Sequence, residues 1–123
     1  HYLEVNLDKW KFKHFKPKEL ACKGTGELLV DDDAISKLDM LRQRLDKPII
    51  VNSAYRSPSY NEKIGGSPSS MHKLGRAFDI SFKGLDKFEL AKIAKEVGFT
   101  GFGYYNSFLH VDTGRERWWG SKW

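Results

Sequence analysis

The chain has 123 residues, 40% of them hydrophobic and 14% aromatic, which is enough to enclose one modest core and too apolar for intrinsic disorder. The net charge of +5 indicates either a solvated surface or attraction to a polyanion such as an anionic cell wall. No nucleic-acid-binding motif accompanies this charge, and no apolar run approaches the ~20 residues that cross a membrane. We therefore expect a monomer that forms one domain over residues 1–123 and binds neither nucleic acid nor membrane.

The first part of the chain predicts an arm followed by one long helix. Residues 1–30 mix aromatic residues with lysines and show no period, apart from a short helix expected at residues 17–20, so we expect an arm packed on the core. From Asp33 onward, apolar residues recur at helical spacing behind an acidic cluster that can cap the first turn. These apolar residues are Ile35, Leu38, Leu41 and Leu45. The helix is expected to end near residues 46–48.

The middle and last parts predict strands around a second helix. Residues 49–52 are a β-branched run typical of a buried strand, whereas residues 56–70 are rich in Ser, Pro and Gly and predict a long structured loop. A strand over residues 77–82, a helix from Asp86 to Gly98 and a hairpin follow. The two hairpin strands are expected at residues 102–105 and 108–112. This order predicts an α+β fold with a mostly antiparallel sheet and flanking helices.

Two of the four histidines occupy positions that suit a metal site. His72 lies where the loop becomes a strand, Gly75 lets the chain turn so that Asp79 reaches the same point, and His110 lies on the last hairpin strand. Two imidazoles and one carboxylate, with a fourth position left for water, suit a catalytic zinc ion. Each of these residues taken separately is more often structural. The single cysteine, Cys22, excludes both an internal disulfide and a thiolate cage.

The motif Ser70-x-His72-x-x-Gly75-x-Ala77-x-Asp79, followed by His110-x-Asp112, resembles the metal-binding signature of the zinc D-alanyl-D-alanine carboxypeptidases. Peptidoglycan endopeptidases and phage endolysins are relatives of that family. The resemblance extends upstream to Ser53-Ala54-Tyr55-Arg56 and covers roughly residues 34–114 of the chain. It implies a hedgehog-type α+β domain that binds Zn²⁺ through His72, Asp79 and His110.

The same resemblance implies a function. It indicates a zinc metallopeptidase that hydrolyses a peptide bond in bacterial peptidoglycan, either as a carboxypeptidase or as an endopeptidase or endolysin. It also implies that Arg56 binds the substrate, and a planar guanidinium is well shaped to hold a carboxylate. The place of action would be the cell wall, which a secreted, periplasmic or phage-delivered protein can reach.

One position departs from the family pattern. Many members carry an acidic general base three residues before the last histidine, where this chain has Ser107. Asp112 is the candidate replacement because side chains two apart on a strand share a face, although it can instead orient a histidine. The departure also keeps open a non-enzymatic zinc module that binds cell wall or protein.

Three further residues are candidates for contact with the substrate. Ser70 either binds a ligand or substrate or shapes its turn. Tyr104 and Tyr105 either line the substrate groove or simply pack, because aromatic hairpin residues often do so.

Overall fold

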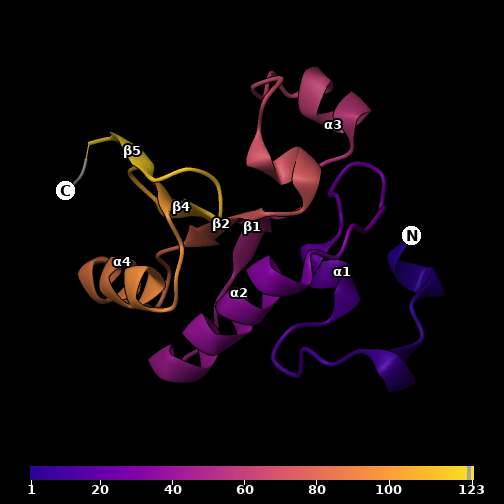
Figure 1. Cartoon of the computed structure of the whole chain (residues 1–123), viewed down its shortest axis with the longest axis horizontal. Coiled ribbons are helices and arrows are strands. Elements are labelled where there is room, and N and C mark those ends of the chain that lie inside the picture. The colour runs from indigo at the N-terminus through magenta and orange to yellow at the C-terminus, as the bar shows by residue number, and fades with distance from the viewer. Residues whose placement is uncertain (122) are drawn as a thin grey trace.

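The structure, a computed structural model, describes residues 1–121 and 123 and contains one five-stranded sheet with helices packed on it (Figure 1). The strands lie in the order β1-β2-β4-β3-β5, and all neighbours are antiparallel except β3 and β5. Their bounds are β1 Val51–Ser53, β2 Ala77–Ser81, β3 Gly101–Tyr104, β4 Phe108–Asp112 and β5 Arg117–Gly120. The predicted α+β class with a mostly antiparallel sheet is confirmed.

The helices begin and end at residues whose side chains and backbone suit those positions. They are α1 Pro17–Leu20, α2 Asp32–Leu45, α3 Pro58–Lys63 and α4 Lys87–Glu96, with 3₁₀ turns η1 Tyr2–Glu4, η2 Leu7–Lys9 and η3 Met71–Leu74. The Asp31 carboxylate accepts a hydrogen bond from the first turn of α2, and Asp86 does the same for α4. Across the described residues, no helix combines the length and apolar character needed to cross a membrane.

Alternation along the strands gives the sheet two different faces. Side chains of one face join the hydrophobic core under α2 and α4, which lie on the same side of the strands in Figure 1. The strand residues of this core are Val51, Phe78, Ile80, Phe102, Tyr104, Leu109 and Val111. Their neighbours along each strand point to the opposite face, since successive strand residues alternate. On β2 the core face carries Phe78 and Ile80, and the opposite face carries Asp79.

The structure differs from the sequence-based expectation at three places. The first strand lies at Val51–Ser53 rather than 49–52, helix α3 interrupts the predicted loop 56–70, and β5 was not predicted. The sequence does contain a signal for the start of α3, because Ser57 caps the helix and Pro58 occupies its first turn. In the arm over residues 1–30, the predicted short helix is present as α1 and three side chains enter the core: Phe12, Phe15 and Leu20.

Candidate functional site

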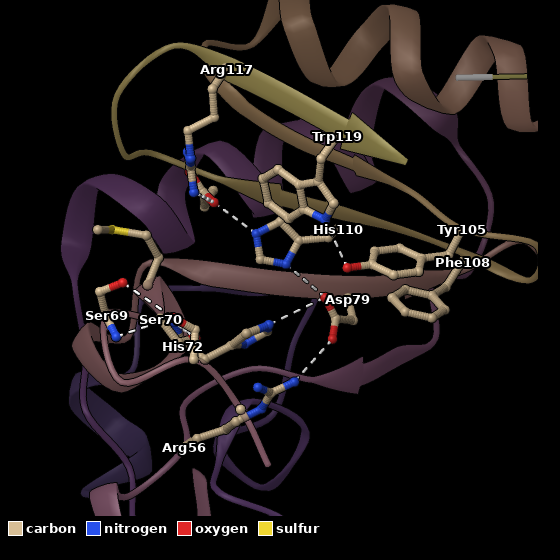
Figure 2. A pocket seen from close by; sticks show the side chains of 14 residues that line it. Arg56, Ser69, Ser70, His72, Asp79, Tyr105, Phe108, His110, Arg117 and Trp119 are labelled. Atoms are coloured by element: carbon tan, nitrogen blue, oxygen red, sulfur yellow. Dashed lines mark hydrogen bonds and ion pairs between the residues drawn. The ribbon is translucent and has the colours of Figure 1, made fainter. Parts of the chain in front are cut away.

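The site lies along one row of residues that crosses the sheet on its polar face. The register pairs Asp79 of β2 with His110 of β4, His110 with Gly103 of β3, and Gly103 with Trp119 of β5. Because paired residues point to the same face, the side chains of Asp79, His110 and Trp119 gather on the side opposite the core. His72 reaches the same point from η3, outside the sheet (Figure 2).

The turn before β2 directs the His72 ring into the site. Ser70 caps η3 by accepting a hydrogen bond from the His72 backbone N–H at 3.1 Å. Gly75 ends the turn with φ of +71°, and a Cβ atom there would lie 2.7 Å from the Leu29 carbonyl oxygen. Glycine is therefore required for both conformation and space, which lets the chain reverse between His72 and Asp79.

Hydrogen bonds on the outer side of each ring set which imidazole nitrogen faces Asp79. His72 Nδ1 lies 2.7 Å from the Ala54 carbonyl oxygen, which can only accept, so Nδ1 carries the hydrogen and Nε2 faces Asp79 Oδ1 at 3.2 Å. His110 Nε2 lies 2.7 Å from Asp112 Oδ2 and donates to it, so Nδ1 faces Asp79 Oδ1 at 2.9 Å. In the neutral tautomers, two nitrogen lone pairs and a carboxylate oxygen therefore point at one another.

This convergence of electron-rich atoms requires positive charge between them. Burial opposes the ionisation of Asp79, yet hydrogen bonds from His110 and His72 prevail and hold the pKa of its carboxyl well below its usual range. Burial also opposes the charging of His110, but its bonds to Asp112 and Asp79 raise its pKa above the usual value. Protons or a metal cation can supply the charge, because a buried carboxylate is costly without a partner.

The three side chains fit a zinc ion in geometry and in chemistry. One donor atom from each of His72, Asp79 and His110 lies within 4.8 Å of the others, and all three residues are buried. Ligands about 2.0–2.2 Å from a tetrahedral zinc lie about 3.3–3.6 Å apart, slightly more than the 3.2 and 2.9 Å that separate His72 Nε2 and His110 Nδ1 from Asp79 Oδ1. Imidazole nitrogen and carboxylate oxygen are ligands that zinc accepts readily.

Asp112 is fully engaged in holding His110. Its side chain is 0% exposed, and each oxygen accepts two hydrogen bonds. Oδ1 accepts from Gly114 N and Arg117, and Oδ2 accepts from His110 and Arg117. Burial raises the pKa of this carboxyl, but the bonds from His110 and Arg117 outweigh it and lower the pKa well below its usual range. These contacts argue against Asp112 as the general base and favour the alternative, in which it orients His110.

Arg56 lies beside the three residues and is held in place by its own contacts. Its guanidinium donates to Ser53 Oγ at 3.0 Å, to Asn61 Oδ1 at 3.2 Å and to Asp79 Oδ2 at 3.4 Å. The side chain keeps 15% exposure and lines the same cavity as the histidines. Its position therefore agrees with the substrate-binding role expected from the sequence.

A cavity of about 470 Å³ opens over these residues. Its aromatic lining comprises Tyr105, Phe108 and Trp119. Arg117 also lines it, so β5 contributes two residues that the sequence reading missed. The available signal was the aromatic pair Trp118-Trp119 after the Gly-containing turn at residues 113–116, because aromatic residues are enriched in strands.

Tyr104 does not reach this cavity, which corrects the expectation that it contacts substrate. It is 4% exposed and belongs to the hydrophobic core, because it pairs with Leu109 in the row next to His110 and points to the other face. Its neighbour Tyr105 lines the cavity instead. Ser70 lines the cavity as well, so its turn-shaping hydrogen bond does not exclude contact with a ligand.

Comparisons with known proteins agree with this geometry. A model of the family described as Peptidase M15 matches residues 13–112. The zinc D-Ala-D-Ala carboxypeptidase of Streptomyces albus G is 38% identical over 89 residues, which are 68% of this chain and 35% of that protein. The peptidoglycan L,D-endopeptidase MepK of Escherichia coli K12 is 34% identical over 80 residues, 59% of this chain and 44% of that protein.

The chain thus spans less than half the length of these curated relatives. The family match, in contrast, covers most of the chain and runs from the N-terminal arm to Asp112 at the end of β4. It includes each of the three residues whose donor atoms converge. The protein therefore belongs to the Peptidase M15 family.

Proposed function

We propose that the protein is a zinc-dependent peptidase that hydrolyses a peptide bond in bacterial peptidoglycan, with His72, Asp79 and His110 as the zinc ligands. The observation that carries this proposal is the convergence of two imidazole nitrogens and a carboxylate oxygen within 4.8 Å. Membership of the M15 family supports it, as do the names of the two relatives, one a zinc D-Ala-D-Ala carboxypeptidase and the other a peptidoglycan L,D-endopeptidase.

Each residue of the site has its own proposed role. A zinc ion held by His72, Asp79 and His110 would supply Lewis-acid activation of a water molecule and of the substrate carbonyl. Asp112 keeps the hydrogen of His110 on Nε2 and leaves Nδ1 free for the metal. Arg56 offers a cationic edge to a carboxylate or carbonyl oxygen of the peptide, while Ser70 adds a hydroxyl to the cavity wall.

The absence of a free acid favours a second candidate, a zinc-containing module that binds cell wall or protein without cleaving it. Ser107 replaces the acidic residue that many family members carry, and within the described chain Asp79 and Asp112 are the carboxylates that line the cavity. Both are engaged by other side chains, so neither is an unhindered proton acceptor. A direct assay of cleavage separates the two candidates.

The assay is mass spectrometry of muropeptides released from purified peptidoglycan by the zinc-loaded protein. We expect hydrolysis products that are missing with the chelator-treated protein and with Asp79→Ala. Release of terminal D-alanine would identify a carboxypeptidase, and separation of cross-linked or internal peptide bonds would identify an endopeptidase. Binding to peptidoglycan without new products would support the non-enzymatic module and contradict the peptidase.

The proposal also includes a monomer that acts without nucleic acid or membrane. Light scattering of the zinc-loaded protein tests the first part. A net charge of +5 favours weak attraction to polyanions at low salt, so nucleic-acid binding is to be measured at physiological salt, where we expect none.

A further inference from the structure

Tyr105 places a hydroxyl group in the aromatic wall of the cavity. It follows directly after β3, keeps 38% exposure, and its ring stacks on Phe108 with centroids 4.4 Å apart and an angle of 9°. Its hydroxyl oxygen accepts a hydrogen bond from Trp119 Nε1 at 2.8 Å. Ring and hydroxyl are therefore both held by neighbours that line the same cavity.

Trp119 is itself held beside His110. The two ring centroids are 4.9 Å apart, and the guanidinium of Arg117 lies 5.1 Å from the Trp119 ring. The indole passes over Gly103 of β3, where a Cβ atom would lie 2.7 Å from its ring atoms. A strand residue without a side chain thus gives Trp119 room to lie next to His110 while its N–H points at Tyr105 (Figure 2).

The direction of this hydrogen bond determines what the Tyr105 hydroxyl can do. An indole N–H only donates, so the Tyr105 oxygen is the acceptor and its own hydrogen remains available. Within the part of the chain that the structure describes, no acceptor takes that hydrogen. Tyr105 thus presents an oriented O–H donor to the cavity that contains His72, Asp79 and His110.

We propose that Tyr105 is a catalytic residue that donates a hydrogen bond to the oxygen of the scissile carbonyl as that oxygen gains negative charge. This inference rests on the peptidase function proposed above. A donor held in place before the reaction stabilises developing charge without reorganisation, and so lowers the barrier more than it strengthens ground-state binding. Trp119 acts through Tyr105 and is a positioning residue. In Figure 2, Tyr105 and Arg56 lie on different sides of Asp79, so each can contact a different part of the peptide.

The test compares Tyr105→Phe with the wild-type protein on the peptide that the wild type cleaves. The variant keeps the ring that stacks on Phe108 and loses only the hydroxyl. We expect kcat to fall about a hundredfold with KM nearly unchanged, as for removal of one oxyanion donor. Tyr2→Phe, which removes a hydroxyl outside this cavity, is the matched control and should change neither constant.

Trp119→Phe tests the positioning role. It retains an aromatic ring beside His110 and removes the N–H that holds the Tyr105 hydroxyl. We expect a smaller loss of kcat, about tenfold, and no further loss when Trp119→Phe is added to Tyr105→Phe, since both changes remove one interaction. Fully additive losses in this double-mutant cycle would overturn the positioning role.

A binding measurement gives a readout that does not depend on turnover. Calorimetric titration with a phosphinate analogue of the cleaved peptide bond should show about hundredfold weaker binding to Tyr105→Phe than to the wild type, at equal zinc content.

If the wild-type protein cleaves the peptide and Tyr105→Phe has the same kcat and the same phosphinate affinity, the role of Tyr105 is overturned and the peptidase function is left intact. A loss confined to KM would also overturn it, in favour of substrate binding alone. A wild-type protein that cleaves no peptidoglycan peptide would instead overturn the proposed function, and this inference with it.

Discussion

The two faces of the same sheet are stabilised in different ways. The face under α2 and α4 carries side chains such as Phe78, Leu109 and Val111, whose packing depends on volume and has little directional requirement. The opposite face carries Asp79, His110 and Asp112, each held by hydrogen bonds of defined donor and acceptor. Along one strand, residues on the core face therefore contribute to stability and their immediate neighbours on the other face form the site. Substitutions at adjacent positions should accordingly change either the unfolding free energy or the zinc binding and activity.

The largest expected difference lies between His110→Ala and Leu109→Ala on β4. His110→Ala removes a proposed zinc ligand, so we expect loss of bound zinc and of activity to background. Leu109 is 0% exposed on the core face, and its truncation should cost about 2–5 kcal/mol of unfolding free energy. Elemental analysis, the muropeptide assay and denaturant unfolding together measure both effects. Full zinc content in His110→Ala would contradict the ligand assignment.

A smaller effect is expected for Asp112→Asn, which tests the role of the residue behind His110. The amide keeps the shape but cannot accept all four hydrogen bonds, so His110 is less well oriented. We expect zinc affinity to fall about 10–100-fold while the zinc-saturated variant keeps most of its kcat. Competition with a metal-binding dye measures the affinity. Complete loss of kcat at full zinc occupancy would contradict a purely orienting role and support Asp112 as the general base.

The smallest effect is expected for Tyr104→Phe, the counterpart of Tyr105→Phe on the other face. The Tyr104 ring packs in the core and its hydroxyl makes no hydrogen bond to a described residue. We expect unchanged kcat and KM, and a change in unfolding free energy within about 0.5 kcal/mol. A fall in kcat comparable to that of Tyr105→Phe would show that the two faces are not separated as the register indicates.

Local patterns in the sequence predicted most of the fold and the central residues of the site. The acidic cap and apolar spacing of α2, the capping residue Asp86 and the alternation of β2 are set by neighbours a few residues apart. Helix α3 was missed because its six residues lie in a segment whose Ser and Pro content also suits a loop. The short β5 was missed because four residues give too little alternation to detect.

What the sequence by itself determined is the identity of the groups that converge: two imidazoles, a carboxylate and a guanidinium, at spacings that resemble a metal-binding signature. Only the tertiary structure decided which residues surround them. The register between β4, β3 and β5 placed Trp119 beside His110, turned Tyr105 into the cavity and Tyr104 out of it, and joined Arg117 to Asp112. The reason is physical: pairing between strands depends on long-range contacts, and a shift of one residue would exchange every side chain between the two faces.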